Sequence, residues 1–334
     1  MVESSRKIAD KAHNRFLEQQ PEHQATQVSP RSLLQSFDDN QKQQINTRYA
    51  AIEATVRERL GEPFFAENGF ILYSGDCVEF LNEIAKSELR INLTITSPPY
   101  NIGKEYERQM SVSEYVDWCN EWMRLVHKVT QWNGTFWLNV GYLEVPGKGL
   151  GVPIPYLIWD KSRFYLLQEI VWAYGAGVSA KRRLSPRNEK WLFYVKDREH
   201  YTFNLDDIRD PNVKYPNQKK NGKYRCNPLG KNPSDVWEIP KVTTGTNRSS
   251  RERTPHPAQF PLAVVERILK ASSNETDIII DPFAGSCSVG IAATGLGRIF
   301  IGFERRADYC QMAVERFRSF MEERRRAEEQ AALF

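Results

Sequence analysis

Segments with strand-like and helix-like patterns alternate along this 334-residue chain, and they constrain its fold more than any other feature. Short runs of β-branched and aromatic residues predict strands at residues 70–73, 91–95, 135–140, 168–174, 189–195, 278–280 and 298–303. Most are separated by stretches with apolar residues at helical spacing, at 77–84, 111–126, 156–164, 260–269, 289–294 and 309–320. This alternation indicates an α/β protein with a mostly parallel, three-layer, Rossmann-like sheet.

The loop Thr96-Ser97-Pro98-Pro99-Tyr100 directly follows the strand predicted at 91–95. Neither proline can donate to a sheet, so the strand ends there, at the edge where open α/β sheets bind ligands. Ser97 Oγ and the Pro98 carbonyl can accept hydrogen bonds from the exocyclic amine of a nucleobase, and Tyr100 offers a flat face for stacking an extruded base. A simple turn with a buried Tyr100 explains the same residues, so the motif alone does not decide.

A second loop of small residues, Asp281-Pro282-Phe283-Ala284-Gly285-Ser286-Cys287-Ser288, follows the strand at 278–280 and lets the backbone approach a ligand closely. Cys287 occupies the second glycine position of a G-x-G-x-x-G pattern, which disfavours a dinucleotide pyrophosphate. Glu304 follows Gly285 by 19 residues, close to the spacing of about 20 at which an acidic side chain binds ribose hydroxyls. A solvated strand end is the alternative for Glu304. Together these residues favour an adenosyl ligand without phosphate, such as S-adenosylmethionine.

Asp76 ends the sequence Ser74-Gly75-Asp76 after the strand at 70–73. Its carboxylate can accept a hydrogen bond from the amino group of a bound ligand. The alternative is a helix N-cap, because a helix is predicted to begin at the next residue.

Residues 204–254 show no periodicity and are strongly basic. A loop of this length inside a compact domain is usually functional, and its Lys, Arg, Asn and Gln side chains are types that bind phosphates or base edges. We therefore favour nucleic-acid contact over a solvated surface loop. The basic residues expected to bind DNA are Lys181, Arg182, Arg183, Lys219, Lys220, Lys223 and Arg225.

The overall composition permits a nucleic-acid partner without requiring one. The formal net charge is +4, and hydrophobic and charged residues make up 40% and 26% of the chain, which is ordinary for a soluble globular protein. The five cysteines have no C-x-x-C spacing and no nearby histidine cluster, so we expect no metal site and a reducing compartment. Neither an apolar N-terminal segment nor an apolar run of about 18 residues occurs, so we expect a cytoplasmic, soluble protein without membrane association.

The N-terminal region divides into two parts. Residues 1–43 are polar, and we expect disorder or a loosely docked helix. Residues 44–60 have helical spacing, and Gly61 and Pro63 end the helix. This helix packs on a partner subunit, on a DNA backbone through Arg48, Arg57 and Arg59, or on the edge of its own domain, which is our default expectation.

These motifs together resemble those of amino-directed DNA methyltransferases of the bacterial restriction-modification type, which methylate N4 of cytosine or N6 of adenine. Residues 281–286 resemble the cofactor loop of this family, Gly302-Phe303-Glu304 its ribose-binding strand end, and Ser97-Pro98-Pro99-Tyr100 its catalytic loop. His256-Pro257 and the following helix resemble the segment that packs beside the cofactor. Residues 170–196 resemble the segment before the recognition region. The resemblance covers roughly residues 69–203 and 255–320.

The order of the motifs, catalytic loop before cofactor loop, resembles the β group of the family. It implies an N-terminal extension (1–68), a catalytic half (69–204), an inserted target-recognition region (205–254), a cofactor-binding half (255–322) and a charged tail (323–334). It argues against protein and RNA methyltransferases with Asn-Pro-Pro-Tyr, in which the cofactor loop usually comes first. Cys287 and Ser288 replace the usual Gly-Thr, so we expect a stiffer loop and a slightly altered cofactor affinity.

The resemblance implies that S-adenosylmethionine is the cofactor and double-stranded DNA the substrate. The implied cofactor-binding residues are Asp76, Asp281, Phe283, Ala284, Gly285, Ser286 and Glu304, and the implied catalytic residues are Ser97, Pro98, Pro99 and Tyr100. Ser97 and the Pro98 carbonyl would hold the amine of a base that flips out against Tyr100.

Several alternatives stay open. Adenine enzymes of the family often have Asp at the position of Ser97, so Ser97 favours N4 of cytosine, with N6 of adenine as the alternative. An RNA methyltransferase and a catalytically silent DNA-binding protein are further alternatives. Whether a cognate restriction endonuclease acts at the same site, and whether the protein is a monomer or a homodimer, is left open.

Overall fold

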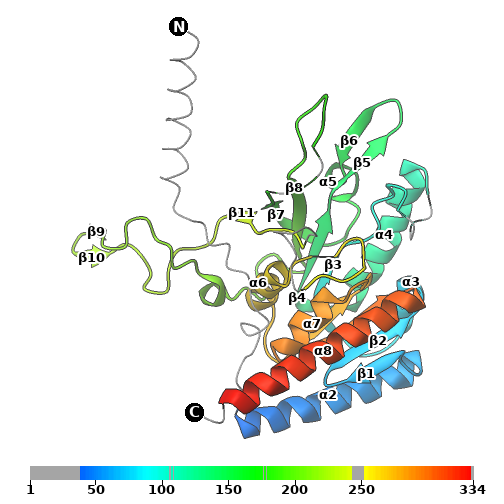
Figure 1. The fold of residues 1–334 in the computed structure, drawn as a ribbon, viewed down its shortest axis with the longest axis horizontal. Helices are drawn as coiled ribbons and strands as arrows, with labels where there is room; N and C mark the ends of the chain where they lie inside the picture. Colours follow the sequence, from blue (N-terminus) through cyan, green and yellow to red (C-terminus); the bar gives the residue numbers. More distant parts are fainter. Residues whose placement is uncertain are drawn as a thin grey trace, which may run out of the picture.

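A nine-stranded sheet organises the protein (Figure 1). The structure, a computed structural model, describes residues 38–104, 107, 109–175, 177, 179–242 and 252–331. Across the sheet the strands follow the order β1 (Phe65–Glu67), β2 (Phe70–Ser74), β13 (Ile299–Glu304), β12 (Ile278–Asp281), β3 (Ile91–Thr96), β4 (Thr130–Val140), β8 (Asn188–Val195), β7 (Tyr165–Ala173) and β11 (Val236–Glu238). The expectations for residues 1–37, and for the part of the recognition region at 243–251, lie outside the described residues.

The five central strands β2, β13, β12, β3 and β4 run parallel to one another. β8 is antiparallel to both β4 and β7, whereas β11 pairs in parallel with β7. The prediction of a mostly parallel α/β sheet is confirmed. Because β12 and β13 lie between β2 and β3, the last third of the chain supplies the centre of the sheet.

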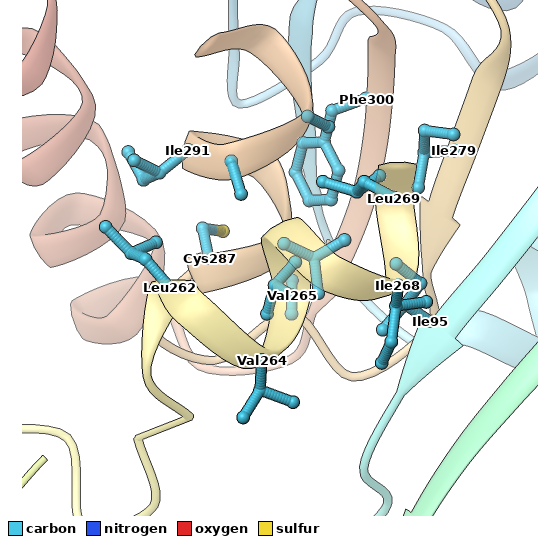
Figure 2. Packing of buried hydrophobic residues seen from close by; sticks show 14 of the residues in the cluster. Ile95, Leu262, Val264, Val265, Ile268, Leu269, Ile279, Cys287, Ile291 and Phe300 are labelled. Atoms are coloured by element: carbon cyan, nitrogen blue, oxygen red, sulfur yellow. The ribbon is translucent and has the colours of Figure 1, made fainter. Parts of the chain in front are cut away.

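Helices cover both faces of the sheet, which gives the predicted three layers. On one face lie α6 (Leu262–Ser272), α7 (Ser288–Gly295) and α8 (Ala307–Ala331), and Figure 2 shows part of this cluster. On the other lie α2 (Asp39–Leu60), α3 (Cys77–Ile84), α4 (Val112–Val129) and α5 (Pro155–Ile158). Successive residues of β12 alternate between the faces: Ile279 packs in the first cluster, and Ile278 and Ile280 pack in the second.

Local capping signals set the helix ends where the sequence predicts them. Ser111 and Glu114 form a reciprocal capping box at the start of α4, and Gly61 ends α2 with φ +78°. α2 packs on the domain's own edge: Ile52 and Val56 are buried in the second cluster, as our default expectation required.

Two segments between β4 and β7 differ from the prediction. A Gly/Pro-rich loop is expected from the sequence over 145–155, but residues 142–153 form a hairpin of β5 (Tyr142–Val145) and β6 (Gly149–Pro153), since Gly147 takes a left-handed conformation with φ +71° at the turn. The helix expected over 156–164 ends at Ile158. Turns follow it, and Ser162 Oγ accepts a hydrogen bond from the Phe164 amide directly before β7 begins.

The described part of the recognition region contains little regular structure. It includes a 3₁₀ turn, η2 (Leu205–Ile208), and a small hairpin of β9 (Lys219–Lys220) and β10 (Lys223–Tyr224), and it returns to the central sheet through β11. In Figure 1 the β9–β10 hairpin projects away from the sheet and its helices. The expected tail at 323–334 continues α8 as far as Ala331. Among the described residues, no helix is both long enough and apolar enough to cross a membrane.

Candidate active site

The catalytic and cofactor motifs meet at the carboxyl edge of the central strands. Residues 97–100 follow β3, residues 282–288 follow the neighbouring strand β12, and Glu304 ends β13 beyond it. Thr96 Oγ1 donates a hydrogen bond of 2.6 Å to Asp281 Oδ1, which joins the ends of β3 and β12. Helices after β3 and β12 cover opposite faces of the sheet, so this junction is a topological switch point, where α/β folds bind ligands.

Asp281 is a buried carboxyl group at this junction. Burial raises its pKa to about 7, although hydrogen bonds from Thr96 Oγ1 and from the Phe283 amide favour the charged form. Asp281 therefore anchors the start of the cofactor loop from inside the sheet.

The tip of the cofactor loop is tied to Glu304. Glu304 Oε2 accepts a hydrogen bond of 2.9 Å from the Gly285 amide, and Oε1 accepts one of 2.9 Å from the Arg306 amide. Burial raises the pKa of Glu304. The carboxylate predicted to meet ribose hydroxyls thus lies directly against the loop predicted to hold the adenosyl group.

Position 285 requires a glycine, both because of its backbone conformation and because His256 leaves no room for a side chain. Its φ is +49°, and a Cβ atom there would lie 2.8 Å from His256 Nε2. This places His256 beside the loop, in agreement with the segment expected to pack next to the cofactor. A loop so free of side-chain bulk fits a small adenosyl ligand.

The underside of the loop is buried. Cys287 has a left-handed conformation with φ +53°, and its side chain points into the cluster that includes Leu262 and Ile291 (Figure 2). From α8, Arg316 Nη1 donates to the Ser286 carbonyl at 2.7 Å and to Ser288 Oγ at 3.0 Å. The loop is therefore restrained by both packing and hydrogen bonds.

The remaining predicted cofactor residues occupy the same edge. Ala284 is buried in the loop. The ring centroid of Phe283 lies 5.4 Å from that of Trp118 and 5.2 Å from that of Trp122, both on α4. Asp76 caps α3, since its Oδ1 accepts a hydrogen bond of 2.8 Å from the Val78 amide. The N-cap alternative is thus observed for Asp76, and its contact with a ligand stays a prediction.

A directed chain of hydrogen bonds begins at Ser97. Ser97 Oγ donates to Tyr100 Oη at 3.0 Å, and Tyr100 Oη donates to Asn139 Oδ1 at 2.8 Å. Asn139 Nδ2 donates to the Lys190 carbonyl at 3.1 Å, which fixes the orientation of the amide. Because each proton points away from Ser97, the lone pairs of Ser97 Oγ are left to accept a hydrogen bond.

Contacts with α4 and β4 hold the rest of the catalytic loop. Pro98 is buried, and the Pro99 carbonyl accepts a hydrogen bond of 3.0 Å from Tyr115 of α4. The Tyr100 ring lies against Gly141, where a Cβ atom would be 3.0 Å from the ring. The loop is thus a fixed surface with a half-buried tyrosine.

The sequence interpretation missed two residues of this site, Asn139 and Glu189. Asn139 is 1% exposed in the otherwise apolar end of β4, and that isolated polar residue was the available signal. Glu189 Oε2 lies 3.4 Å from Tyr100 Oη, but nothing in the local sequence of β8 indicates this contact.

The predicted DNA-binding residues are exposed and lie on two segments. Lys181, Arg182 and Arg183 belong to the loop between β7 and β8, whereas Lys219, Lys220, Lys223 and Arg225 belong to the β9–β10 hairpin and its flank.

The sheet order and the two adjacent loops define a Rossmann-like protein with a ligand site at the switch point. A family model described as DNA methylase (N6_N4_Mtase) matches residues 91–315. The chain is 56% identical over 263 residues to the type II methyltransferase M.ScaI of Streptomyces caespitosus, covering 79% of this chain and 86% of that protein. It is 32% identical over 261 residues to the DNA adenine methyltransferase YhdJ of Escherichia coli K12, covering 75% and 84%.

A solved structure, the cytosine-N4-specific PvuII DNA methyltransferase, has the same fold with a TM-score of 0.57 and 20% identity, covering 77% of this chain and 91% of that one. The protein belongs to the N6/N4 DNA methylase family. It is accordingly a DNA methyltransferase, and S-adenosylmethionine is its methyl donor.

Proposed function

We propose that this protein methylates N4 of cytosine within a specific site of double-stranded DNA. The observation that carries the choice of base is the side chain at the acceptor position. Ser97 presents a hydroxyl group, whereas the adenine enzymes that the motif resembles often have the carboxylate of an aspartate there. The hydrogen-bond chain through Tyr100 and Asn139 supports the role of Ser97 as an acceptor.

The catalytic loop orients the amine. Ser97 Oγ and the Pro98 carbonyl accept hydrogen bonds from the exocyclic NH₂ group, and the ring of Tyr100 stacks on the flipped base. The contact between Pro99 and Tyr115 keeps these groups in place before the base arrives. The rate enhancement then comes mainly from positioning.

The neighbouring loop holds the cofactor. Residues 283–286 supply a close backbone surface for the adenosyl group, Glu304 binds the ribose hydroxyls, and Asp281 and Asp76 complete the set. Bound there, S-adenosylmethionine supplies an electrophilic methyl group on a sulfonium ion. The hydrogen bond between Thr96 and Asp281 supports this assignment, because it fixes the two loops next to each other.

DNA contact is assigned to the two exposed basic segments. The β9–β10 hairpin is a narrow basic ribbon, and a two-stranded ribbon fits the major groove of B-DNA. Lys181, Arg182 and Arg183 add phosphate contacts from the β7–β8 loop. Because M.ScaI is named a type II methyltransferase, we propose as partner a restriction endonuclease that acts at the same site.

N6 of adenine is the second candidate. It is favoured by the 32% identity with YhdJ, whose name specifies adenine. The fold and the cofactor loop suit both bases, so only the product distinguishes the candidates.

Nucleoside mass spectrometry is the deciding experiment. Unmethylated plasmid DNA is incubated with the protein and S-adenosylmethionine, with Ser97→Ala as the control for contaminating activity. N4-methylcytosine supports the proposal, whereas N6-methyladenine overturns the choice of base. A parallel incubation replaces the plasmid with RNA, and modification of the RNA alone, or of neither nucleic acid, overturns the assignment of DNA as the substrate.

A further inference from the structure

Lys241, which follows β11 in the recognition region, is linked to the catalytic tyrosine through Glu189. Lys241 Nζ lies 2.5 Å from Glu189 Oε1, and the other carboxylate oxygen lies 3.4 Å from Tyr100 Oη. Tyr174 Oη donates to Glu189 Oε1 at 3.3 Å. Glu189 therefore contacts both the Lys241 ammonium group and the Tyr100 hydroxyl group. The same hydroxyl group accepts the hydrogen bond from Ser97.

The lysine is held in a fixed position. Its ammonium group lies 3.9 Å from the centroid of Tyr174 and 5.7 Å from that of Trp172, within the range of cation–π attraction. The backbone two residues earlier is also bound, since Trp172 Nε1 donates to the Ile239 carbonyl at 2.7 Å. A shift of this part of the recognition region would therefore move the partner of Glu189.

Asn139 and Glu189 both offer an acceptor to the single proton of Tyr100 Oη. This oxygen lies 2.8 Å from Asn139 Oδ1 and 3.4 Å from Glu189 Oε2. While Lys241 neutralises Glu189, the amide oxygen is the closer partner. A carboxylate that has lost Lys241 is a stronger acceptor and draws the phenol toward itself.

We propose that Glu189 and Lys241 are positioning residues that make the orientation of Tyr100, and through it of Ser97, depend on the docked position of the recognition region. The pair acts through Tyr100 and does not touch the base. The inference rests on the proposed function for its effect on methylation, but the contact itself is independent of which base is modified.

The kinetic test compares Lys241→Met and Glu189→Gln with matched controls. Lys270 and Glu266 of α6 form a pair of similar length and exposure, 2.6 Å with side chains 36% and 10% exposed, against 31% and 16% for Lys241 and Glu189. Single-turnover methyl transfer is measured at saturating DNA and cofactor, and DNA affinity is measured separately. We expect Lys241→Met to lower the transfer rate about 10- to 100-fold, the scale of a small misplacement. Glu189→Gln should stay within a few-fold of the wild-type rate, because its neutral amide does not compete with Asn139 Oδ1 for the phenol proton. DNA affinity should change less than about twofold, because the pair does not touch the base.

Further variants test for one shared route. Lys270→Met and Glu266→Gln should keep the wild-type rate. The double variant Glu189→Gln/Lys241→Met should be faster than Lys241→Met alone, because no unneutralised carboxylate remains beside Tyr100, and Lys241→Arg should keep most of the wild-type rate. Equal rates in Lys241→Met and Lys270→Met, or a loss confined to DNA affinity, would overturn the proposal.

A second measurement does not require methylation. The protein is labelled with 3-fluorotyrosine, and the ¹⁹F resonance of Tyr100 is assigned by its absence in Tyr100→Phe. We expect Lys241→Met and Glu189→Gln to shift this resonance and Lys270→Met to leave it in place. An unmoved resonance refutes the contact. A wild-type protein that methylates no base refutes the proposed function instead, and the spectrum then still decides the coupling.

Discussion

The cofactor loop and the recognition region differ in how far their residues are buried and restrained. In the loop, residues 284–288 are buried, and Glu304, Arg316 and His256 restrain them. In the recognition region, the side chains of the β9–β10 hairpin are exposed, and the hairpin contributes only two short strands. The cofactor loop is a packed, internally restrained segment, whereas the hairpin exposes charged and hydrogen-bonding side chains to the solvent. Substitutions in the cofactor loop and the sheet around it should therefore affect the rate of methyl transfer or the stability of the fold. Substitutions in the hairpin should affect the affinity for DNA.

The largest expected effect is at Ser97. Ser97→Ala removes the proposed acceptor of the amine, and we expect single-turnover methyl transfer to fall by about 10³-fold or more. DNA affinity, measured by fluorescence anisotropy, should stay at the wild-type value. Ser111→Ala is the control, because it removes a serine hydroxyl at the start of α4 and should leave the rate unchanged. Full activity of Ser97→Ala would contradict the assigned role.

Removal of hairpin charge should produce the converse result. For the triple variant Lys219→Ala/Lys220→Ala/Lys223→Ala we expect about 10²-fold weaker DNA binding at moderate salt, and a salt dependence shallower by up to about 2.7 in log–log slope. The transfer rate at saturating DNA should not change. The control is the triple variant Lys86→Ala/Arg325→Ala/Arg326→Ala. Lys86 is exposed after α3, and the two arginines are exposed on α8. This variant removes the same charge and should bind DNA nearly as tightly as wild type. Equal weakening in both variants would show that net charge, not the hairpin, determines binding.

Gly285 tests how closely the cofactor loop is packed. Gly285→Ala places a Cβ atom against His256 in a left-handed backbone, and we expect a loss of about 2–3 kcal/mol in the free energy of unfolding. Gly147→Ala is the matched control, since Gly147 has φ +71° and no atom within 4 Å of a built Cβ. It should cost about 1–2 kcal/mol from the backbone alone. Denaturant unfolding measures both, and equal losses would mean that the contact with His256 contributes nothing.

Asp281 gives the smallest effect, and it depends on pH. Because burial raises its pKa to about 7, the folded state keeps the proton between about pH 4 and pH 7 while the unfolded chain releases it. This carboxyl group therefore favours folding at low pH, and its contribution is lost as the pH rises to 7. The stability of Asp281→Asn relative to wild type should increase by about 2 kcal/mol from pH 5 to pH 7 and level off above about pH 8. A difference that is constant with pH would show that Asp281 has an ordinary pKa.

The sequence predicts the central strands and their covering helices well, because the signals for these elements are local. The capping box of Ser111 and Glu114 joins residues three apart, and the alternation of Ile278, Ile279 and Ile280 needs only the strand itself. β11 was missed because it has three residues and buries only Trp237. The β5–β6 hairpin was missed because its glycines and prolines are also typical of loops.

The candidate site is predictable to the level of its loops and no further. Ser97 and Gly285 lie in short motifs, so each could be identified from its neighbours in sequence. Asn139 and Glu189 both contact Tyr100, which is 39 and 89 residues away in the sequence. Only the pairing of β4 with β8 brings these side chains to one hydroxyl group.

The order of strands in the sheet also has a consequence for synthesis of the chain. β12 pairs with β3, and Asp281 bonds to Thr96 across 185 residues. A ribosome therefore releases β2, β3 and β4 long before their central neighbours exist, and the two inner edges stay unpaired until β12 and β13 emerge. Pairing across such separations is slow, so we expect these strand edges to be exposed for longer during folding than edges paired by neighbouring segments. We expect the methyl-transfer centre to assemble late in folding, because it needs the loops after both β3 and β12.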